Sequence, residues 1–578
     1  MTFNKLPSVK IHSDEKCITG WNAIRSQISD FIGSKETVVI ECYHGVAIDQ
    51  FILWSKDAFP DCKILDAADA FRSEEDILKR THSDVTDDRI FGFMTKRTLD
   101  DFLDSEKINA IRAKIDKTQG VSIVIGIGSS LIVEDPDLLI YADMARWEIQ
   151  MRMRRKEVVN IGLSNQTEGF EIHYKRAYFL DWRVCDSLKK KLVGKWDYIL
   201  DTNDHNNPKM ISAAMFHQAM EQTVKQPFSV VPFFDPGPWG GQWMREKFDL
   251  DSEPDNFAWG FNCVPEENSL LLDFHGVTFE MPSINLVFFK TTELLGVKVE
   301  ERFGAEFPIR YDFLDTIQGG NLSLQVHPLD AYIKEHFGMD YTQDESYYML
   351  DAEPDAEVYL GLKDDIDSKS MIADLKKAQS SGAQFDADKY AAKWPAKKHD
   401  HFLIPGGTVH CSGAGSMVLE ISATPYIFTF KLWDWGRLGM DGKPRPINIE
   451  HGEKVIQWDR QTEWTKTNLI NNIQKVGGGD GWREERTGLH DLEFIETRRH
   501  WHSVPVTHHT EGGVNVLMIV EGDQAVVECP QNSFEPFEVN YAEAFIIPAC
   551  IKSYIVRPIG LSEGKEIATL KAYVRTNE

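Results

Sequence analysis

The sequence predicts a multidomain protein: an N-terminal α/β doubly wound parallel sheet, followed by an all-β double barrel of the jelly-roll type with a helical insertion. The first observation is the length of 578 residues, which exceeds what one hydrophobic core supports. The second is the alternation of strand-like and helix-like segments through about the first 225 residues. The third is the succession of short strands and turn signals that follows.

Composition and charge exclude several classes of protein. The chain is 42% hydrophobic and 26% charged, as in ordinary globular proteins. Its net charge of −27 argues against binding to nucleic acid or to an anionic membrane, because both need clustered positive charge. A small anionic substrate needs only two or three local cations and stays compatible with this composition.

Cysteine usage and hydropathy indicate a cytoplasmic protein. The eight cysteines are scattered without a C-x-x-C pair, which is typical of reduced thiols in a large cytosolic protein. The first 20 residues lack the apolar core of a signal sequence. The longest apolar stretch, 121–133, is short and broken by glycine, which favours a buried strand over a membrane span. The oligomeric state stays open.

The first domain, 1–225, is predicted from apolar strands separated by charged helices. Runs that are apolar on both faces are typical of parallel strands covered by helices on each side. The expected strands lie at 36–45, 62–71, 120–130, 137–144 and 195–202.

The order of these elements resembles the nucleoside- and adenylyl-kinase branch of P-loop proteins. The first strand enters a turn at Gly45, where a phosphate-binding loop would lie, and an arginine-bearing segment follows residues 137–144. However, "ECYHGVAIDQF" (41–51) lacks the G-x-x-x-x-G-K-[ST] pattern and so has neither the lysine for phosphates nor the hydroxyl for magnesium. Gly126 and Gly128 form a G-x-G without the third glycine. We interpret this domain as a degenerate, kinase-like structural or regulatory module, with nucleotide binding left open.

The second half contains an internal repeat. "HFLIPGGTVH" (401–410) and "AFIIPACIKS" (544–553) share an F-x-I-P core, which predicts two related barrels. The first copy ends on His410 and the second on Ser553, so we expect a metal site in the first barrel alone. The expected divisions are 226–360 and 401–490 for the first barrel with its linker, 361–400 for the helical insertion, and 491–578 for the second barrel.

Four side chains with metal-binding chemistry occur in an order that suits one barrel. Gln325 and His327 alternate onto one face of a predicted strand. Glu345 lies in "QDESYYML", where residues 345, 347 and 349 alternate onto one side, and His410 closes the first repeat. Imidazole, carboxylate and amide oxygen suit zinc or another first-row divalent ion. Taken singly, each histidine is more often a hydrogen-bonded core residue and the glutamate a paired or solvated carboxylate; the combination favours a metal site.

The motifs around these residues resemble those of type I phosphomannose isomerases, which are zinc-dependent cupin enzymes. The resemblance covers about 230–575. It is carried by "GPWGGQWM" (237–244), "NLSLQVHPLD" (321–330), "DESYYML" (344–350), "IPGGTVH" (404–410), "WDWGR" (433–437) and "GKPRPINIEHG" (442–452).

This resemblance implies an enzyme of carbohydrate metabolism that interconverts mannose 6-phosphate and fructose 6-phosphate. It also implies that one zinc ion per chain is held by Gln325, His327, Glu345 and His410. Ser323, on the same strand face, would line the substrate pocket. Glu420 in "MVLEIS" matches an active-site carboxylate of the family and is our candidate for carrying a proton.

Two departures from the family pattern bear on the substrate. Where the family has a lysine before Q-V-H-P, this chain has Asp312, with Arg310 two residues earlier on the same face. The family arginine upstream of D-W-G-R falls on Lys431, whereas Arg437 of the motif is kept; the two would share a strand face if the strand ran unbroken. We expect Lys431, Arg437 and Arg310 to hold the phosphate or polarise an oxygen. A lysine in place of arginine keeps the charge but loses bidentate phosphate geometry, so the exact sugar stays open.

Other functions stay open at this point. An Fe(II) cupin oxygenase would present an H-x-H pair with a carboxylate, and Gln325 at the first histidine position counts against it. A second site at His500, His502, His508 and His509 competes with a solvated, histidine-rich strand end, which we favour. A sugar- or nucleotide-sensing protein without activity would not need the metal-binding set.

Overall fold

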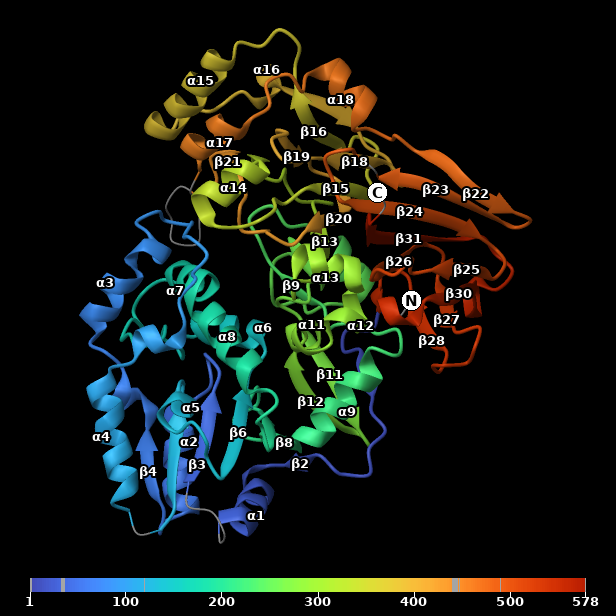
Figure 1. Cartoon of the computed structure of the whole chain (residues 1–578). Coiled ribbons are helices and arrows are strands. Elements are labelled where there is room, and N and C mark those ends of the chain that lie inside the picture. Colours follow the sequence, from blue (N-terminus) through green and yellow to red (C-terminus); the bar gives the residue numbers. More distant parts are fainter. Residues whose placement is uncertain are drawn as a thin grey trace. The chain divides into compact units, whose positions relative to one another are not determined.

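The computed structural model of the chain describes residues 3–32, 37–118, 120–438, 445, 447–488 and 490–576. The described residues form two compact units (Figure 1). The α/β unit comprises Ser8–Thr223 and Ser269–Phe289, and the β unit takes the rest. Within these described ranges, no helix is both long enough and apolar enough to cross a membrane.

The α/β unit is built on a mixed sheet in the order β2-β8-β7-β6-β3-β5-β4. The ladder from β4 to β7 is parallel, whereas β8 and β2 add antiparallel strands at one edge. Strands β5 and β6 are buried along their whole length, as expected for strands with helices on both faces. This confirms the predicted doubly wound sheet and adds the antiparallel edge. The strands are β2 (Ile18–Thr19), β3 (Thr37–Cys42), β4 (Lys63–Asp66), β5 (Ser122–Gly126), β6 (Leu138–Asp143), β7 (Tyr198–Asp201) and β8 (Lys209–Ser212).

Helices of this unit begin where the sequence supplies caps. Ser73 accepts a hydrogen bond from the Asp76 amide at the start of α3, and Asp104 caps α4 in the same way. The helices are α1 (Trp21–Ile32), α2 (Ile48–Ala58), α3 (Glu74–Val85), α4 (Ser105–Asp116), α5 (Ser129–Ile132), α6 (Arg146–Arg154), α7 (Phe170–Arg176), α8 (Trp182–Leu192) and α9 (Ala213–Thr223), with short helices η1 (Ala67–Ala70), η2 (Leu99–Phe102) and η3 (Ala177–Asp181).

A later stretch of the chain, Ser269–Phe289, also belongs to the α/β unit. It forms β11 (Ser269–Phe274), β12 (Val277–Pro282) and α11 (Ile284–Phe289), and β11 pairs with β1 (Ser8–Lys10). The Asn285 side chain accepts from the buried Lys189 ammonium and donates to Asp143. The sequence did not predict this return, because the segment lies inside a region of short strands.

The first part of the β unit is a sandwich of antiparallel strands, here called the first sandwich. One sheet has the order β18-β15-β20-β13-β10-β9 and the other β17-β16-β19-β14-β21. In the 361–400 stretch, α15 (Ser368–Ser381) and α16 (Ala387–Tyr390) precede β17, which returns to the sheet. The strands are β9 (Phe233–Asp235), β10 (Trp259–Cys263), β13 (Ile309–Asp315), β14 (Leu324–Val326), β15 (Glu345–Ala352), β16 (Glu357–Leu362), β17 (Ala391–Pro395), β18 (His401–Ile404), β19 (His410–Ser412), β20 (Ser416–Ala423) and β21 (Phe430–Trp433).

The second sandwich closes the chain with sheets ordered β22-β23-β24-β31-β26-β29 and β25-β30-β27-β28. Residues such as Leu517, Phe545 and Val556 form its buried apolar core. The repeat is visible in both sandwiches, since each copy is a strand, a turn and a strand that passes to the other sheet. The strands are β22 (Gln474–Gly479), β23 (Trp482–Gly488), β24 (Ile495–His502), β25 (Val506–His509), β26 (Asn515–Glu521), β27 (Gln524–Glu528), β28 (Phe537–Asn540), β29 (Ala544–Ile547), β30 (Ser553–Pro558) and β31 (Ile567–Val574).

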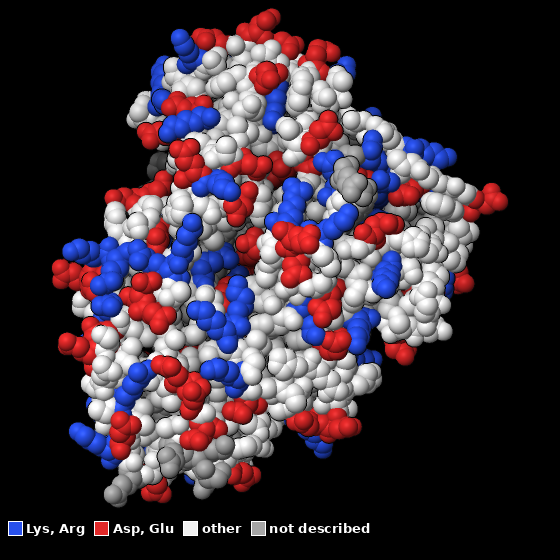
Figure 2. Space-filling model, viewed as in Figure 1, with Lys and Arg blue, Asp and Glu red and all other residues white. Residues whose placement is uncertain are grey.

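Short helices connect the strands of the β unit. They are α10 (Trp243–Phe248), α12 (Thr291–Leu295), α13 (Val297–Phe303), α14 (Asp330–Phe337), α17 (Ile449–Val455) and α18 (Thr462–Asn468), with η4 (Ala549–Ile551) and η5 (Gly560–Ser562). On the face drawn in Figure 2 both signs of charge are interspersed, and Lys and Arg side chains gather over the part of the α/β unit that carries α3, α7 and α8.

Candidate metal centre

The predicted metal ligands come from both sheets of the first sandwich. Strand β14 has a neighbour on each side in its sheet, and it pairs Gln325 with His410 on one side and with Lys431 on the other. His327 follows directly after this strand. Glu345 begins β15 in the opposite sheet and reaches across to both histidines.

These side chains converge in the interior. Glu345 lies 3.1 Å from His327 Nε2 through one carboxylate oxygen and 2.8 Å from His410 Nε2 through the other. Ligand atoms of these three buried residues all lie within 4.8 Å of one another, and within the described part of the chain they form the one such group of His, Cys, Asp or Glu. The Gln325 amide nitrogen is 3.2 Å from His410 Nε2. The oxygen and nitrogen of a glutamine amide are nearly indistinguishable in shape, so a 180° rotation of the amide places the Gln325 oxygen where the nitrogen now lies, next to His410 Nε2.

Each histidine is oriented for metal binding by its other nitrogen. His410 Nδ1 donates to the Thr408 carbonyl at 2.8 Å, and His327 Nδ1 faces the Phe428 carbonyl at 3.4 Å. This leaves both Nε2 atoms toward Glu345, the arrangement common among metal-binding histidines. Buried His327 Nε2 has no partner with hydrogen-bond geometry. Burial favours the neutral Glu345 carboxyl, but the two imidazoles hold its pKa well below the usual range. The group therefore fits a divalent ion such as zinc.

A wall of polar side chains extends from this group along strands β13, β20 and β15. Register pairs Asp312 with Glu420 and Glu420 with Tyr347, and the neighbouring row joins Arg310, Ser422 and Glu345. Both rows are buried in the first sandwich. We call the residues Arg310, Asp312, Tyr347, Glu420 and Ser422 the polar wall.

Charges on the polar wall are tightly coupled. Arg310 and Asp312 form an ion pair of 2.7 Å. The Gln343 amide donates to both Glu345 and Glu420, at 3.3 and 3.2 Å. Burial raises the pKa of Asp312 to about 7, although Arg310 opposes the shift. Burial, with repulsion from Glu345 and Asp312, raises the pKa of Glu420 well above its usual value.

Lys431 and Arg437, two of the cations expected to hold the phosphate, lie in different local structures. Strand β21 ends at Trp433, and the turn that follows places Trp435 and Gly436 in the left-handed region, so Lys431 and Arg437 do not share an unbroken strand. Arg437 is held by Asp434 at 2.6 Å and by the Asn321 carbonyl at 2.7 Å.

Asp434 collects further partners at this turn. It accepts from the Ser323 hydroxyl at 2.9 Å and pairs with Arg445 at 2.8 Å. Burial, together with repulsion from Arg445, lowers the pKa of Lys431 to about 8. The Asp434 carboxylate, next to Lys431, is therefore the centre of a cluster formed by Ser323, Arg437 and Arg445.

Sequence reasoning missed Gln343, Tyr347, Asp434 and Arg445. Tyr347 was the one with a usable signal, because it alternates onto the same strand face as Glu345. The others act from loops, where alternation predicts nothing. In "GKPRPINIEHG", residues 442–444 and 446 lie outside the described residues.

The histidines of the second sandwich are not the solvated strand end that we favoured. His500, His502 and His508 are at most 3% exposed, because they lie in the interior between the sheets. His500 and His508 pack ring against ring at 4.4 Å. Within the described residues they do not form a convergent ligand group like that of the first sandwich.

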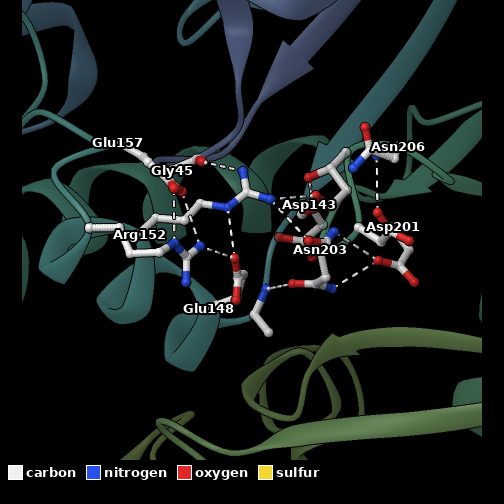
Figure 3. Close-up of polar contacts among 12 residues, drawn as sticks. Gly45, Asp143, Glu148, Arg152, Glu157, Asp201, Asn203 and Asn206 are labelled. Atoms are coloured by element: carbon white, nitrogen blue, oxygen red, sulfur yellow. Dashed lines mark hydrogen bonds and ion pairs between the residues drawn. The ribbon is translucent and has the colours of Figure 1, made fainter.

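At the Gly45 turn, where a phosphate-binding loop was predicted, an arginine of the protein contacts the backbone. Arg152 of α6 donates to the Gly45 carbonyl at 3.1 Å and to the carbonyls of Thr202 and Asn203 at 3.1 and 3.0 Å (Figure 3). It also pairs with Glu148 at 2.9 Å. The carboxyl ends of β3 and β7 are thus bridged by a side chain of the protein itself.

The β unit is therefore a double antiparallel sandwich with one buried nitrogen and oxygen group that fits a metal ion. The chain is 30% identical to mannose-6-phosphate isomerase of Streptococcus mutans serotype c over 220 residues, which is 38% of this chain and 64% of that protein. It thus spans less than two thirds of that relative. Homology to mannose-6-phosphate isomerases, which are enzymes, covers about 40% of the chain and confirms this much of the resemblance.

Residues 20–225 match a family model described as "Domain of unknown function (DUF8485)". Among solved structures, mannose 6-phosphate isomerase from Bacillus subtilis aligns with a TM-score of 0.48 at 16% identity, covering 60% of this chain and 99% of that one. A zinc-bound mannose 6-phosphate isomerase aligns with a TM-score of 0.45 at 13% identity and the same coverage. The kinase-like character of the N-terminal domain stays a prediction.

Proposed function

We propose that this protein is a metal-dependent aldose–ketose isomerase acting on a sugar phosphate, with mannose 6-phosphate and fructose 6-phosphate as the expected pair. The observation that carries the proposal is the buried convergence of His327, Glu345 and His410. The homology to mannose-6-phosphate isomerases supports the same reading. One zinc ion per chain and a cytoplasmic location remain predictions.

The reaction moves a proton between C1 and C2 of the sugar. When bound by His327, Glu345, His410 and Gln325, a divalent ion supplies Lewis-acid stabilisation of negative charge on sugar oxygens. Glu420 is the candidate proton carrier, because it lies on the polar wall, shares the Gln343 amide with Glu345, and burial raises its pKa above that of an ordinary carboxyl. Gln343 holds one of its carboxylate oxygens by a hydrogen bond.

The phosphate is assigned to the cations next to β21. Lys431 lies beside the Ser323, Arg437 and Arg445 cluster around Asp434. Arg437 is already engaged with Asp434 and a backbone carbonyl, so its role is to position this cluster. Lys431 is then the cation best placed to bind the phosphate.

The test is isomerase activity as a function of bound metal. We expect chelation to abolish turnover of mannose 6-phosphate and added Zn²⁺ to restore it. His410→Ala should lose both metal and turnover, because it removes one arm of the convergent group, whereas His336→Ala changes an exposed helix residue and should keep both. Full turnover by metal-stripped protein would refute the proposal.

For the α/β unit we infer a structural or regulatory role without phosphotransfer. Two observations support this role: Arg152 ties the turn after β3 to the turn after β7 through the Gly45, Thr202 and Asn203 carbonyls, and residues 41–51 lack the lysine and hydroxyl of a phosphate loop.

A further inference from the structure

Some polar atoms of the polar wall are buried without a hydrogen-bond partner among the described residues. Buried atoms without a hydrogen-bond partner include Asp312 Oδ1 and Arg310 Nε. Buried polar groups in proteins are almost always hydrogen-bonded. Their clustering on one face beside Glu345 indicates that a ligand supplies the missing partners.

One oxygen of the Asp312 carboxylate is held by an ion pair, and the other has no hydrogen-bond partner. One oxygen pairs with Arg310 at 2.7 Å, and the guanidinium of Arg310 in turn lies 4.2 Å from the centre of the Tyr426 ring. The other oxygen, Oδ1, has no partner. A carboxylate held on one side in this way presents its second oxygen as an oriented acceptor.

We propose that Asp312, held by Arg310, determines which sugar the site accepts by taking a hydrogen bond from one of its hydroxyl groups. This inference rests on the proposed sugar-phosphate isomerase function and deepens it. It assigns the hydroxylated carbons of the substrate to the polar wall and the phosphate to the side of β21.

Either a hydroxyl or the phosphate of the substrate could face Asp312, and the charges around Asp312 favour the hydroxyl. Asp312, Glu420 and Glu345 place carboxylates in adjacent rows of the wall, and the wall's cation, Arg310, is paired with Asp312. A dianionic phosphate would find this cation already engaged by Asp312, whereas Lys431 and the arginines around Asp434 lie on the side of β21. Asp312 Oδ1 lacks a hydrogen-bond donor. A sugar hydroxyl can supply that donor.

The competing role for Asp312 is to neutralise Arg310 and nothing more. Asp312→Asn separates the two roles, because the amide oxygen still accepts from Arg310 while the charged acceptor for the substrate is lost. Asp351→Asn is the matched control, since Asp351 is another acidic residue of the first sandwich whose carboxylate accepts from the Trp243 indole at 2.9 Å.

The experiment compares the metal-loaded wild type with both variants on mannose 6-phosphate and on analogues that lack the hydroxyl at C3 or at C4. In the wild type, loss of the recognised hydroxyl should lower kcat/KM by about 10- to 100-fold, the range for a hydrogen bond to a charged group. Asp312→Asn should lose a similar factor on the complete sugar and little more on that analogue. Asp351→Asn should behave like the wild type.

Unchanged discrimination by Asp312→Asn, with wild-type metal content, would overturn the inference. Calorimetric binding of a hexitol 6-phosphate, which cannot isomerise, separates it from the proposed function. If no sugar phosphate turns over but Asp312→Asn binds the hexitol phosphate at least 10-fold more weakly than the wild type, the isomerase proposal fails and the role of Asp312 in recognition stands. Equal binding by both proteins, or no binding by either, overturns the role of Asp312.

Discussion

Gly241 shows how a single residue outside the site supports it. Its Cβ position would lie 2.1 Å from Asp315 Oδ1 and 2.6 Å from the Ile317 carbonyl. The Asp315 carboxylate accepts from the Met244 amide at 2.8 Å and from the Ile317 amide at 3.0 Å. The W-G-G segment is thereby fastened to the end of β13, from which the chain continues to Gln325.

We therefore expect Gly241→Ala to lower the free energy of unfolding by about 1–3 kcal/mol, the usual cost of forcing atoms into a packed interior. Denaturant unfolding of the metal-free protein measures it. Gly513→Ala is the control, because its Cβ would meet atoms no closer than 3.6 Å and should change stability by less than about 0.5 kcal/mol. Equal stability of the two variants would show that the segment can shift without cost.

Residues of the site were predictable where strand alternation governs them. Gln325, His327 and Glu345 follow from the period of two and from motif order, and the structure brings His327 and Glu345 together with His410. Lys431 and Arg437 would have shared a strand face only on an unbroken strand, and the turn at Trp435 interrupts it. Gln343 acts from a loop, and no local pattern marks a loop residue that bridges two carboxylates.

At the scale of elements, the interior of the second sandwich contains a cluster of neutral histidines. Burial lowers the pKa of His502 to about 4 and lowers those of His500 and His508 as well. The charged groups near His500 are Glu484, 3.3 Å from its Nε2, with Lys571 and Arg498. Near His502 the charged group is Glu566, whose attraction opposes the effect of burial. His502 is fixed by its Nδ1 contact with the Val504 carbonyl at 2.9 Å.

These shifts make the stability depend on pH. Because the folded-state pKa of His502 is below the unfolded value of about 6.5, the unfolded chain binds the proton more tightly. The stabilisation is present above pH 6.5 and is lost as the pH falls toward 4, at a total of about 3 kcal/mol for this residue. Urea unfolding between pH 7 and pH 4, followed by tryptophan fluorescence, measures the loss.

His502→Gln should reduce this dependence on pH, since the glutamine does not titrate. His509→Gln is the control, because His509 is exposed on β25 and should keep the wild-type dependence. If wild type and His502→Gln lose stability in parallel on acidification, the buried imidazole is not the titrating group.

The sequence predicted the existence of strands better than it predicted which strands pair with one another. The parallel strands of the α/β unit were located from apolar runs, because burial on both faces leaves a local trace in the sequence. The row from Asp312 through Glu420 to Tyr347 depends instead on strands far apart in the chain. Register between distant strands is set by packing of the complete sandwich, and no short segment records it.

At the scale of the whole molecule, the chain crosses between its units more than once. Ser269–Phe289 is covalently part of the second half but completes the α/β unit. Phe289 packs against Trp196 at 5.8 Å and Phe216 at 5.9 Å. Asn285 completes the contacts of the fully buried Lys189, which also pairs with Asp143 at 2.8 Å. An N-terminal domain that ends near residue 225 therefore lacks part of its own core.

This arrangement predicts the behaviour of fragments. A fragment of residues 8–223 would expose Trp196 and Phe216, leave β1 without its partner β11, and open the Lys189 and Asp143 pair to water. We expect it to be unfolded, or to unfold at a much lower urea concentration than the same residues joined through a flexible linker to 269–289. Circular dichroism during urea unfolding compares the two. A fragment of 8–223 with the same midpoint as the joined form would mean that the returning segment packs on a unit that is already complete, and the boundary near residue 225 would then be a true limit of independent folding.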